Sequence, residues 1–143
     1  MPRVRAQYTR RMTAPTPYLL FPGTAAEALA HYRDVFGGEL QTFDYAAMGR
    51  VDGPGDAIAH GELRGVVDIA GADAGADDDA VHMGGMFLSL LGTADAATLT
   101  RWFDALAEGG HVISALETRP WGDVDGTLVD RHGIRWLIGY HPE

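Results

Sequence analysis

The sequence predicts an α+β fold built from two copies of one unit, a strand and a helix followed by three strands. Residues 18–25 (YLLFPGTA) and 87–94 (FLSLLGTA) are similar, and each leads into a helical pattern that ends at paired glycines, Gly37-Gly38 and Gly109-Gly110. An internal repeat of half the chain length indicates two supersecondary units, each too small to bury its apolar face alone. The two copies should therefore pack together, with a ligand site where they meet.

In the first copy, a strand over residues 17–21 is followed by a helix over about residues 25–36. Thr24 and Glu27 have the spacing of a capping box, in which each side chain accepts a backbone hydrogen bond at the helix start. Apolar residues of the helix recur on one face, which should pack against the sheet. Three strands are then expected, at residues 39–45, 57–64 and 66–70, with Gly65 alone forming a tight hairpin between the last two.

The second copy repeats this order, with a helix over about residues 96–108. Its apolar side chains recur at helical spacing and indicate a core stripe: Leu99, Trp102, Phe103 and Leu106. Trp136 alternates with Ile134 and Ile138, which is typical of a residue in the core or in a dimer interface. The four strands of this copy are expected at residues 86–91, 111–117, 127–130 and 134–140.

Residues 17–143 are expected to form a single domain, with one module at about residues 17–72 and the other at about residues 84–141. Between the modules, residues 73–83 are rich in aspartate, alanine and glycine, which is typical of a solvated linker. The adjacent aspartates lack the alternating ligand spacing of a calcium loop. Residues 1–16 contain four arginines and no apolar periodicity, so we interpret them as a flexible tail.

Composition excludes several classes of function. The chain of 143 residues has no cysteine, which rules out disulfides, thiolate metal sites, iron–sulfur clusters and cysteine nucleophiles. A formal net charge of −9 argues against a nucleic-acid partner, because the phosphate backbone repels a negative surface. The sequence has no apolar stretch long enough to cross a bilayer and no signal-peptide pattern, so we expect a cytoplasmic protein without a membrane partner. Arginine wholly replaces lysine, which is typical of a GC-rich bacterial genome.

Three local motifs carry a resemblance to a known family. They are residues 58–63 (IAHGEL), Glu117-Thr118 with Trp121-Gly122, and the series Asp130, Gly133 and Trp136. Together with the order of elements, these motifs make residues 17–140 similar to the vicinal oxygen chelate superfamily of glyoxalases, bleomycin-resistance proteins and dioxygenases, and within it to the PhnB-like group. The resemblance implies an eight-stranded mixed-sheet half-barrel around a ligand cavity, often completed in a homodimer. Asp125 stands where the nearer relatives usually have an aromatic residue, which changes the polarity of the cavity.

The resemblance also implies where a metal would bind. In metal-using members, four inward positions on the first, fourth, fifth and eighth strands hold a divalent ion that chelates vicinal oxygens of the substrate. By strand register these positions fall near Pro17 or Tyr18, at Asp68, near Met86 and near Leu137. Because only Asp68 among them is a suitable ligand for a hard cation, the resemblance implies that this chain lacks the usual metal cofactor.

One strand carries a histidine and a carboxylate on the same face. His60 and Glu62 are two residues apart and alternate with Ile58, so the three side chains should point the same way. A histidine and a carboxylate in this arrangement can share a ligand or exchange a proton. The alternative is that this face points to solvent, or that His60 satisfies a hydrogen bond in the core.

Two further carboxylates are candidates for catalysis. Asp68 lies in an apolar segment, where a carboxylate is costly unless it is paired or part of a site, and the alternative is a salt bridge to Arg64 or Arg135. Glu117 ends the sixth strand and Trp121 begins the loop after it, which would place an acid or base beside an aromatic wall. The alternative is that Trp121 only closes the end of the barrel.

Two classes of function therefore remain open. The first is a metal-independent small-molecule binder, for example one of the sequestering or resistance type. The second is an enzyme, a lyase, isomerase or dioxygenase-like catalyst of a substrate with vicinal oxygens, working with or without a divalent metal held by the catalytic residues. The residues assigned to ligand contact are Tyr18, Glu62, Met86 and Trp121, and those assigned to catalysis are His60, Asp68 and Glu117.

Overall fold

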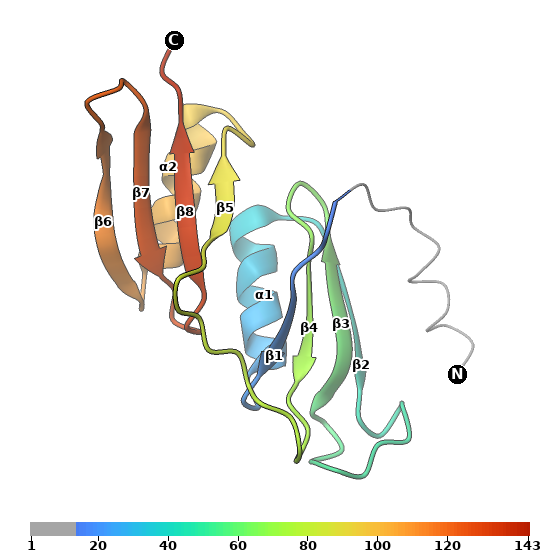
Figure 1. The fold of residues 1–143 in the computed structure, drawn as a ribbon. Helices are drawn as coiled ribbons and strands as arrows, with labels where there is room; N and C mark the ends of the chain where they lie inside the picture. The colour runs from blue at the N-terminus through green and yellow to red at the C-terminus, as the bar shows by residue number, and fades with distance from the viewer. Residues whose placement is uncertain (1–13) are drawn as a thin grey trace. The chain divides into compact units, whose positions relative to one another are not determined.

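The computed structural model describes residues 14–143, and the predicted N-terminal tail falls almost entirely on residues outside this range. The chain forms two compact units, one ending at Val81 and the other beginning at His82. Each unit contains one helix and one four-stranded sheet (Figure 1). Within residues 14–143, no helix has the length and apolar character needed to span a membrane.

Unit 1 has its strands in the order β1-β4-β3-β2. Strand β1 is parallel to β4, and the other neighbouring strands are antiparallel. The elements are β1 (Tyr18–Phe21), α1 (Ala25–Phe36), β2 (Glu39–Asp44), β3 (Ile58–Arg64) and β4 (Ile69–Asp73).

Unit 2 repeats the same plan with the order β5-β8-β7-β6, and β5 is parallel to β8 as β1 is to β4. Its elements are β5 (Leu88–Leu91), α2 (Ala96–Ala107), β6 (His111–Thr118), β7 (Val124–Val129) and β8 (Arg135–Tyr140). The predicted α+β fold of two β-α-β-β-β units is therefore confirmed.

In unit 1, the helix covers one face of the sheet, and the core lies between them. A side chain added at Gly61 of β3 would come within 2.6 Å of Leu29 on α1, so Gly61 faces the helix. Because side chains alternate along a strand, His60 and Glu62 point to the opposite face. We call this the open face of unit 1 because the helix of the unit does not cover it. The large side chains on the helix side are buried: Leu19, Phe21, Leu29, Tyr32, Leu63 and Ile69.

In unit 2, the helix stripe packs against one face of the sheet in the same way. The residues predicted to form this stripe are all buried: Leu99, Trp102, Phe103 and Leu106. Trp136 is 1% exposed and belongs to the core together with Leu128 and Ile138. The alternate residues of the strands point to the other face, the open face of unit 2, which includes Asp125 and Leu137.

The start of α1 corrects the predicted capping box. The side chain of Thr24 makes no capping hydrogen bond. Instead, the buried carboxylate of Asp73 accepts hydrogen bonds from the backbone N–H of Ala25 through Oδ1 and from that of Ile58 through Oδ2, both at 2.8 Å. The helix is thus capped by a residue that was predicted to lie in a linker, because Asp73 is the last residue of β4 and this strand brings its side chain to the helix start.

The third and fourth strands form the predicted antiparallel hairpin, but the one-residue turn predicted at Gly65 is wrong. The turn spans residues 65–68, and Asp68 accepts a hydrogen bond from the backbone N–H of Gly65 at 3.0 Å. Strand β4 therefore begins at Ile69, three residues later than predicted, and Asp68 lies in the turn rather than within a buried strand. Two other strand starts move as well, because β5 begins at Leu88 and β7 at Val124.

Candidate functional site

A pocket of about 410 Å³ lies in unit 2, where β5 and β8 end and β7 begins. This volume is within the range of small-molecule sites in proteins. The residues that line it are Leu91, Gly92, Trp121, Asp123, Val124, Asp125, Gly139, Tyr140 and His141.

The pocket combines apolar walls with two carboxylates. Trp121 is 68% exposed and contributes an indole that a ligand can contact, and Leu91 and Tyr140 add further apolar surface. Asp123 Oδ1 lies 2.7 Å from Nδ1 of His141, at the solvent-exposed side of the pocket. The pocket thus offers one apolar surface and fixed hydrogen-bond acceptors, the usual composition of a ligand site.

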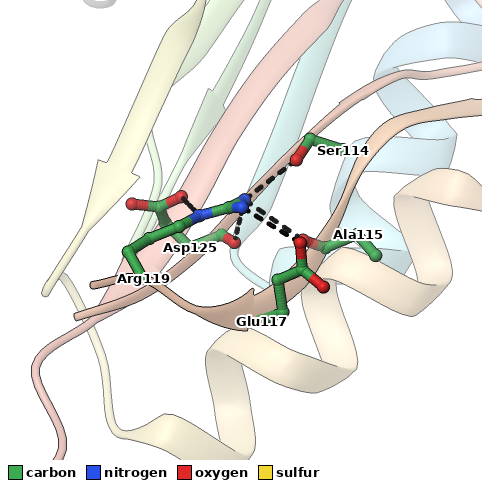
Figure 2. A network of polar contacts seen from close by, with 5 residues as sticks. All are labelled: Ser114, Ala115, Glu117, Arg119 and Asp125. Atoms are coloured by element: carbon green, nitrogen blue, oxygen red, sulfur yellow. Dashed lines mark hydrogen bonds and ion pairs between the residues drawn. The ribbon is translucent and has the colours of Figure 1, made fainter. Parts of the chain in front are cut away.

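Arg119 holds the other carboxylate, that of Asp125, in place (Figure 2). Its Nε donates to Asp125 Oδ1 at 2.8 Å, and its Nη2 donates to the backbone carbonyl of Asp125 at 2.9 Å. The same Nη2 reaches Ser114 Oγ at 2.9 Å and the carbonyl of Ala115 at 3.3 Å, while Nη1 contacts Glu117 Oε1 at 3.1 Å. The hydrogen bond with Asp125 raises the pKa of Arg119 above its usual value, so this side chain stays charged.

The Arg119 contacts gather around a β-bulge in strand β6. Ser114 pairs with Thr127 and Glu117 pairs with Asp125, so two residues of β6 lie opposite Gly126 alone. A Cβ atom at Gly126 would lie 2.8 Å from both the amide nitrogen of Leu116 and the carbonyl oxygen of Ser114. Glycine is therefore required at this position, and the bulge turns backbone and side-chain acceptors toward Arg119.

Glu117 does not line this pocket, whereas Trp121 does. The Glu117 side chain is 62% exposed and pairs with Arg119. The carboxylates that share the pocket lining with Trp121 are those of Asp123 and Asp125. Two acids other than Glu117 therefore share the pocket lining with Trp121.

A second polar cluster lies on the open face of unit 1. The hydroxyl of Tyr18 on β1 is 2.8 Å from Nδ1 of His60 on β3, and the two rings are stacked with their centroids 5.5 Å apart. His60 Nε2 lies 3.5 Å from Glu62 Oε1. Arg64 donates to the other oxygen, Glu62 Oε2, from Nη2 at 2.7 Å and from Nε at 3.0 Å. We call these four residues, Tyr18, His60, Glu62 and Arg64, the Tyr18 row.

Burial divides the Tyr18 row into an accessible end and a covered middle. Tyr18 is 50% exposed, whereas His60 is 5% exposed and Glu62 is 9% exposed. His60 and Glu62 lie on the same strand face, as their spacing predicted, and they are buried rather than open to solvent. A pocket of about 470 Å³ reaches Glu62 and Arg64 at the other end of the row.

Two of the three predicted catalytic residues, His60 and Asp68, lie apart from each other within unit 1. Asp68 precedes Ile69, which pairs with Leu63, so it lies at the far end of β3 from His60, about 13 Å away at 3.3 Å per residue. Glu117 belongs to unit 2. Met86 precedes β5 and is exposed. Among residues 14–143, there is no group of three or more histidines, aspartates or glutamates able to hold a metal ion.

The strand register also tests the metal site that the resemblance implies. The open-face residues of the first, fourth, fifth and eighth strands are Tyr18, Leu20, Ala70, Ala72, Ser89, Leu91, Arg135, Leu137 and Gly139. In these four strands of the described chain, the open face thus offers no histidine, aspartate or glutamate. Tyr18, the one phenol among them, is already in contact with His60. This donor set does not fit a divalent cation.

The fold is a pair of β-α-β-β-β units, each of which holds a pocket of small-molecule size. A sequence model of the Glyoxalase/Bleomycin resistance protein/Dioxygenase superfamily matches residues 15–138. The chain therefore belongs to this superfamily, as its motifs implied.

Relatives within the superfamily match nearly the whole chain. Protein YjdN of Escherichia coli is 29% identical over 137 residues, which cover 86% of this chain and 92% of YjdN. The structure of PA1353 from Pseudomonas aeruginosa is similar with a TM-score of 0.75 and 29% identity, over 92% of this chain and 100% of PA1353. The PhnB protein from Bacillus cereus shares the fold, with a TM-score of 0.71 and 19% identity over 90% of this chain and 99% of that one.

Arg119, Asp123 and His141 were not among the residues singled out from the sequence. Their roles depend on the bulge in β6 and on the pairing of β7 with β8, which no local pattern reveals. A signal for Arg119 is its position two residues after Glu117 and six before Asp125, because an arginine between two carboxylates in adjacent strands often pairs with both.

Proposed function

We propose that the protein binds a small organic molecule in the pocket of unit 2, and that its own side chains hold this ligand without a metal ion. The supporting observation is that the exposed indole of Trp121 and the fixed carboxylate of Asp125 border the same pocket. The mismatch between the superfamily's metal positions and the residues found there supports the second part of the proposal. A sequestering or resistance-type protein would need no more than such a site.

The ligand chemistry follows from the lining. Trp121, Tyr140 and Leu91 suit a flat or apolar body, because aromatic side chains bury large areas against such groups. Arg119 occupies Asp125 Oδ1 and leaves the rest of the carboxylate to accept a hydrogen bond from the ligand. We therefore expect an aromatic or partly apolar compound that carries at least one hydrogen-bond donor.

Trp121 provides the assay. Of the three tryptophans, Trp102 and Trp136 are buried in the core, so an added compound reaches Trp121 first. Chelator-treated protein is titrated with a panel of aromatic metabolites and antibiotics, and tryptophan emission is recorded with the melting temperature. The proposal predicts compounds that change both, and it predicts that Trp121→Phe removes the change in emission.

A matched pair of variants tests the location. Leu91→Trp places a large side chain in the pocket, whereas Val112→Trp places the same side chain at a comparably exposed site on β6, outside the pocket lining. Calorimetric titration with a compound found above should show binding lost in Leu91→Trp and kept in Val112→Trp. Equal affinity in the two variants, or a panel without any binder, would overturn the proposal.

A further inference from the structure

A hydrogen-bonded turn carries Trp121 at the edge of the unit 2 pocket. The backbone N–H of Gly122 donates to the carbonyl of Arg119 at 2.9 Å, and the N–H of Arg119 donates to the carbonyl of Asp123 at 2.7 Å. Pro120 precedes Trp121 and restricts the backbone of this turn. Gly122 has a φ of 101°, a conformation that favours glycine. The turn that supplies the aromatic wall is therefore fixed before a ligand binds, which lowers the entropy cost of binding.

The carboxylates of this pocket have acceptor atoms to spare, whereas the neighbouring donors are in use. All three nitrogens of the Arg119 guanidinium donate to oxygens of β6 and β7, and Arg119 is not part of the pocket lining. His141 donates from Nδ1 to Asp123 Oδ1, because a carboxylate only accepts. Asp123 and Asp125 are each bound through Oδ1, and no group of residues 14–143 donates to Oδ2 of either. A ligand is therefore needed to supply donors to these two atoms.

The charges around the pocket are also unbalanced. Asp125 and Glu117 both pair with Arg119, so one guanidinium faces two carboxylates. Asp123 adds a third carboxylate, and its partner His141 has a side chain that is 76% exposed. The side chain of Asp125 is only 23% exposed, and a ligand that covers it removes water from a carboxylate without full charge compensation. Such desolvation costs free energy, and a positive charge on the ligand offsets that cost.

We propose that the ligand of the unit 2 pocket is an organic cation, a protonated amine attached to an aromatic or apolar body. Asp123 and Asp125 are two residues apart, which in an extended chain is a spacing of about 7 Å, so one ammonium group can reach both. An ammonium group has three donors and is attracted to the face of an indole, so it can contact both carboxylates and Trp121 together. This inference rests on the proposed function, because it assigns the charge of the ligand in that same pocket.

Three probes that share a phenyl ring and differ in charge test this assignment. Phenethylamine is a cation at neutral pH, phenethyl alcohol is neutral and phenylacetate is an anion. Each is titrated by calorimetry into the chelator-treated full chain at neutral pH and constant salt. We expect phenethylamine to bind about tenfold more tightly than phenethyl alcohol, and phenylacetate to bind more weakly than either. Binding should be lost in Leu91→Trp, which fills the pocket.

Variants that remove one charge locate the preference. Asp125→Asn should lower the affinity for phenethylamine by about tenfold and leave that for phenethyl alcohol nearly unchanged. Asp123→Asn provides the same test if Asp125→Asn does not fold. Glu108→Gln removes a charge at an exposed position outside the pocket lining and should change neither affinity.

The outcomes separate the charge of the ligand from the existence of the pocket. Equal affinity for the three probes, or tighter binding of phenylacetate, would overturn the cation. If that binding were lost in Leu91→Trp, the proposed function would still stand. Failure of phenethylamine to bind would also overturn the cation, whereas the compound panel decides the proposed function by itself.

Discussion

The carboxylate of Asp73 caps helix α1 by accepting a hydrogen bond at 2.8 Å from the backbone N–H of Ala25, 48 residues earlier in the chain. Its second oxygen accepts from the N–H of Ile58 at the start of β3. One buried side chain therefore ties together the starts of a helix and a strand and the end of β4.

Replacing Asp73 by alanine should destabilise the protein strongly. Two buried backbone donors would lose their acceptor, and we expect the free energy of unfolding to fall by about 3 kcal/mol. Urea unfolding followed by circular dichroism measures the change. Asp34→Ala, on the exposed surface of α1, is the matched control and should change stability little. Similar values for the two variants would show that the cap contributes little.

Asp130 plays a comparable part in unit 2. Its Oδ1 accepts from the backbone N–H groups of His132 and Ile134, and its Oδ2 accepts from the indole Nε1 of the buried Trp136 at 2.9 Å. Asp130→Ala should lower the free energy of unfolding by about 3 kcal/mol and alter the near-ultraviolet circular dichroism of Trp136. The exposed substitution Glu108→Ala in the same unit should leave that spectrum unchanged, and an unchanged spectrum in Asp130→Ala would contradict the assigned contact.

Gly126→Ala tests the link between the bulge and the pocket. The added methyl group would lie 2.8 Å from the backbone of β6, so the bulge must shift and carry the acceptors of Arg119 with it. We expect a loss of stability of about 1–3 kcal/mol and weaker binding in the unit 2 pocket. Gly84→Ala meets no atom within 4 Å and is the control. If a folded Gly126→Ala protein bound the ligand as tightly as the unaltered protein, the bulge would not be needed for binding in the unit 2 pocket.

The N-cap of α2 should make stability depend on pH. Asp95 accepts a hydrogen bond from the N–H of Thr98 at 2.8 Å, and its hydrogen bonds with Thr98 lower the pKa of Asp95 below the ordinary value of an aspartate. A carboxyl group whose pKa is lower in the folded state stabilises the protein above its unfolded value, and this contribution disappears as the pH falls through the folded value.

The stability difference between the unaltered protein and Asp95→Ala should therefore be full at neutral pH and shrink below about pH 4. Melting temperatures recorded between neutral and acid pH give this difference directly. Asp104 lies on the exposed side of the same helix, and the stability difference between the unaltered protein and Asp104→Ala should stay the same as the pH falls. A difference that stays constant across the range would mean that the charged form of Asp95 is not what caps the helix.

The spacing of apolar residues along the sequence was sufficient to predict the repeated order of strands and helices and much of the core. The helix predicted over residues 25–36 has the bounds of α1, and the apolar stripe of α2 is buried as expected. The fourth strand was displaced because the apolar run at residues 66–70 has the composition of a strand, whereas Gly71 and Asp73 do not. Pairing with β1, and the hydrogen bonds of Asp73, decide the position of β4, and both are contacts across long sequence separations.

The candidate site was predictable only where one strand carries it. Alternation placed His60 and Glu62 on one face, but the contact of His60 with Tyr18 depends on the order β1-β4-β3, which brings together residues 42 positions apart. The Arg119 cluster depends on a bulge, and one unpaired residue reverses the face of every later side chain in a strand. The assignments of Met86 and Asp68 moved for a different reason, because β5 and β4 begin after these residues rather than before them.

The most direct test of a metal-independent ligand site measures metal content and ligand binding in one sample. Untagged protein purified without chelator is analysed for iron, zinc, nickel, manganese and cobalt. The same protein is titrated with a compound that the panel identified as a ligand, while tryptophan emission is recorded. We predict far less than one metal ion per chain together with a saturable change in emission. About one metal ion per chain, with the change in emission lost when the metal is removed and regained when it is restored, would contradict the proposal.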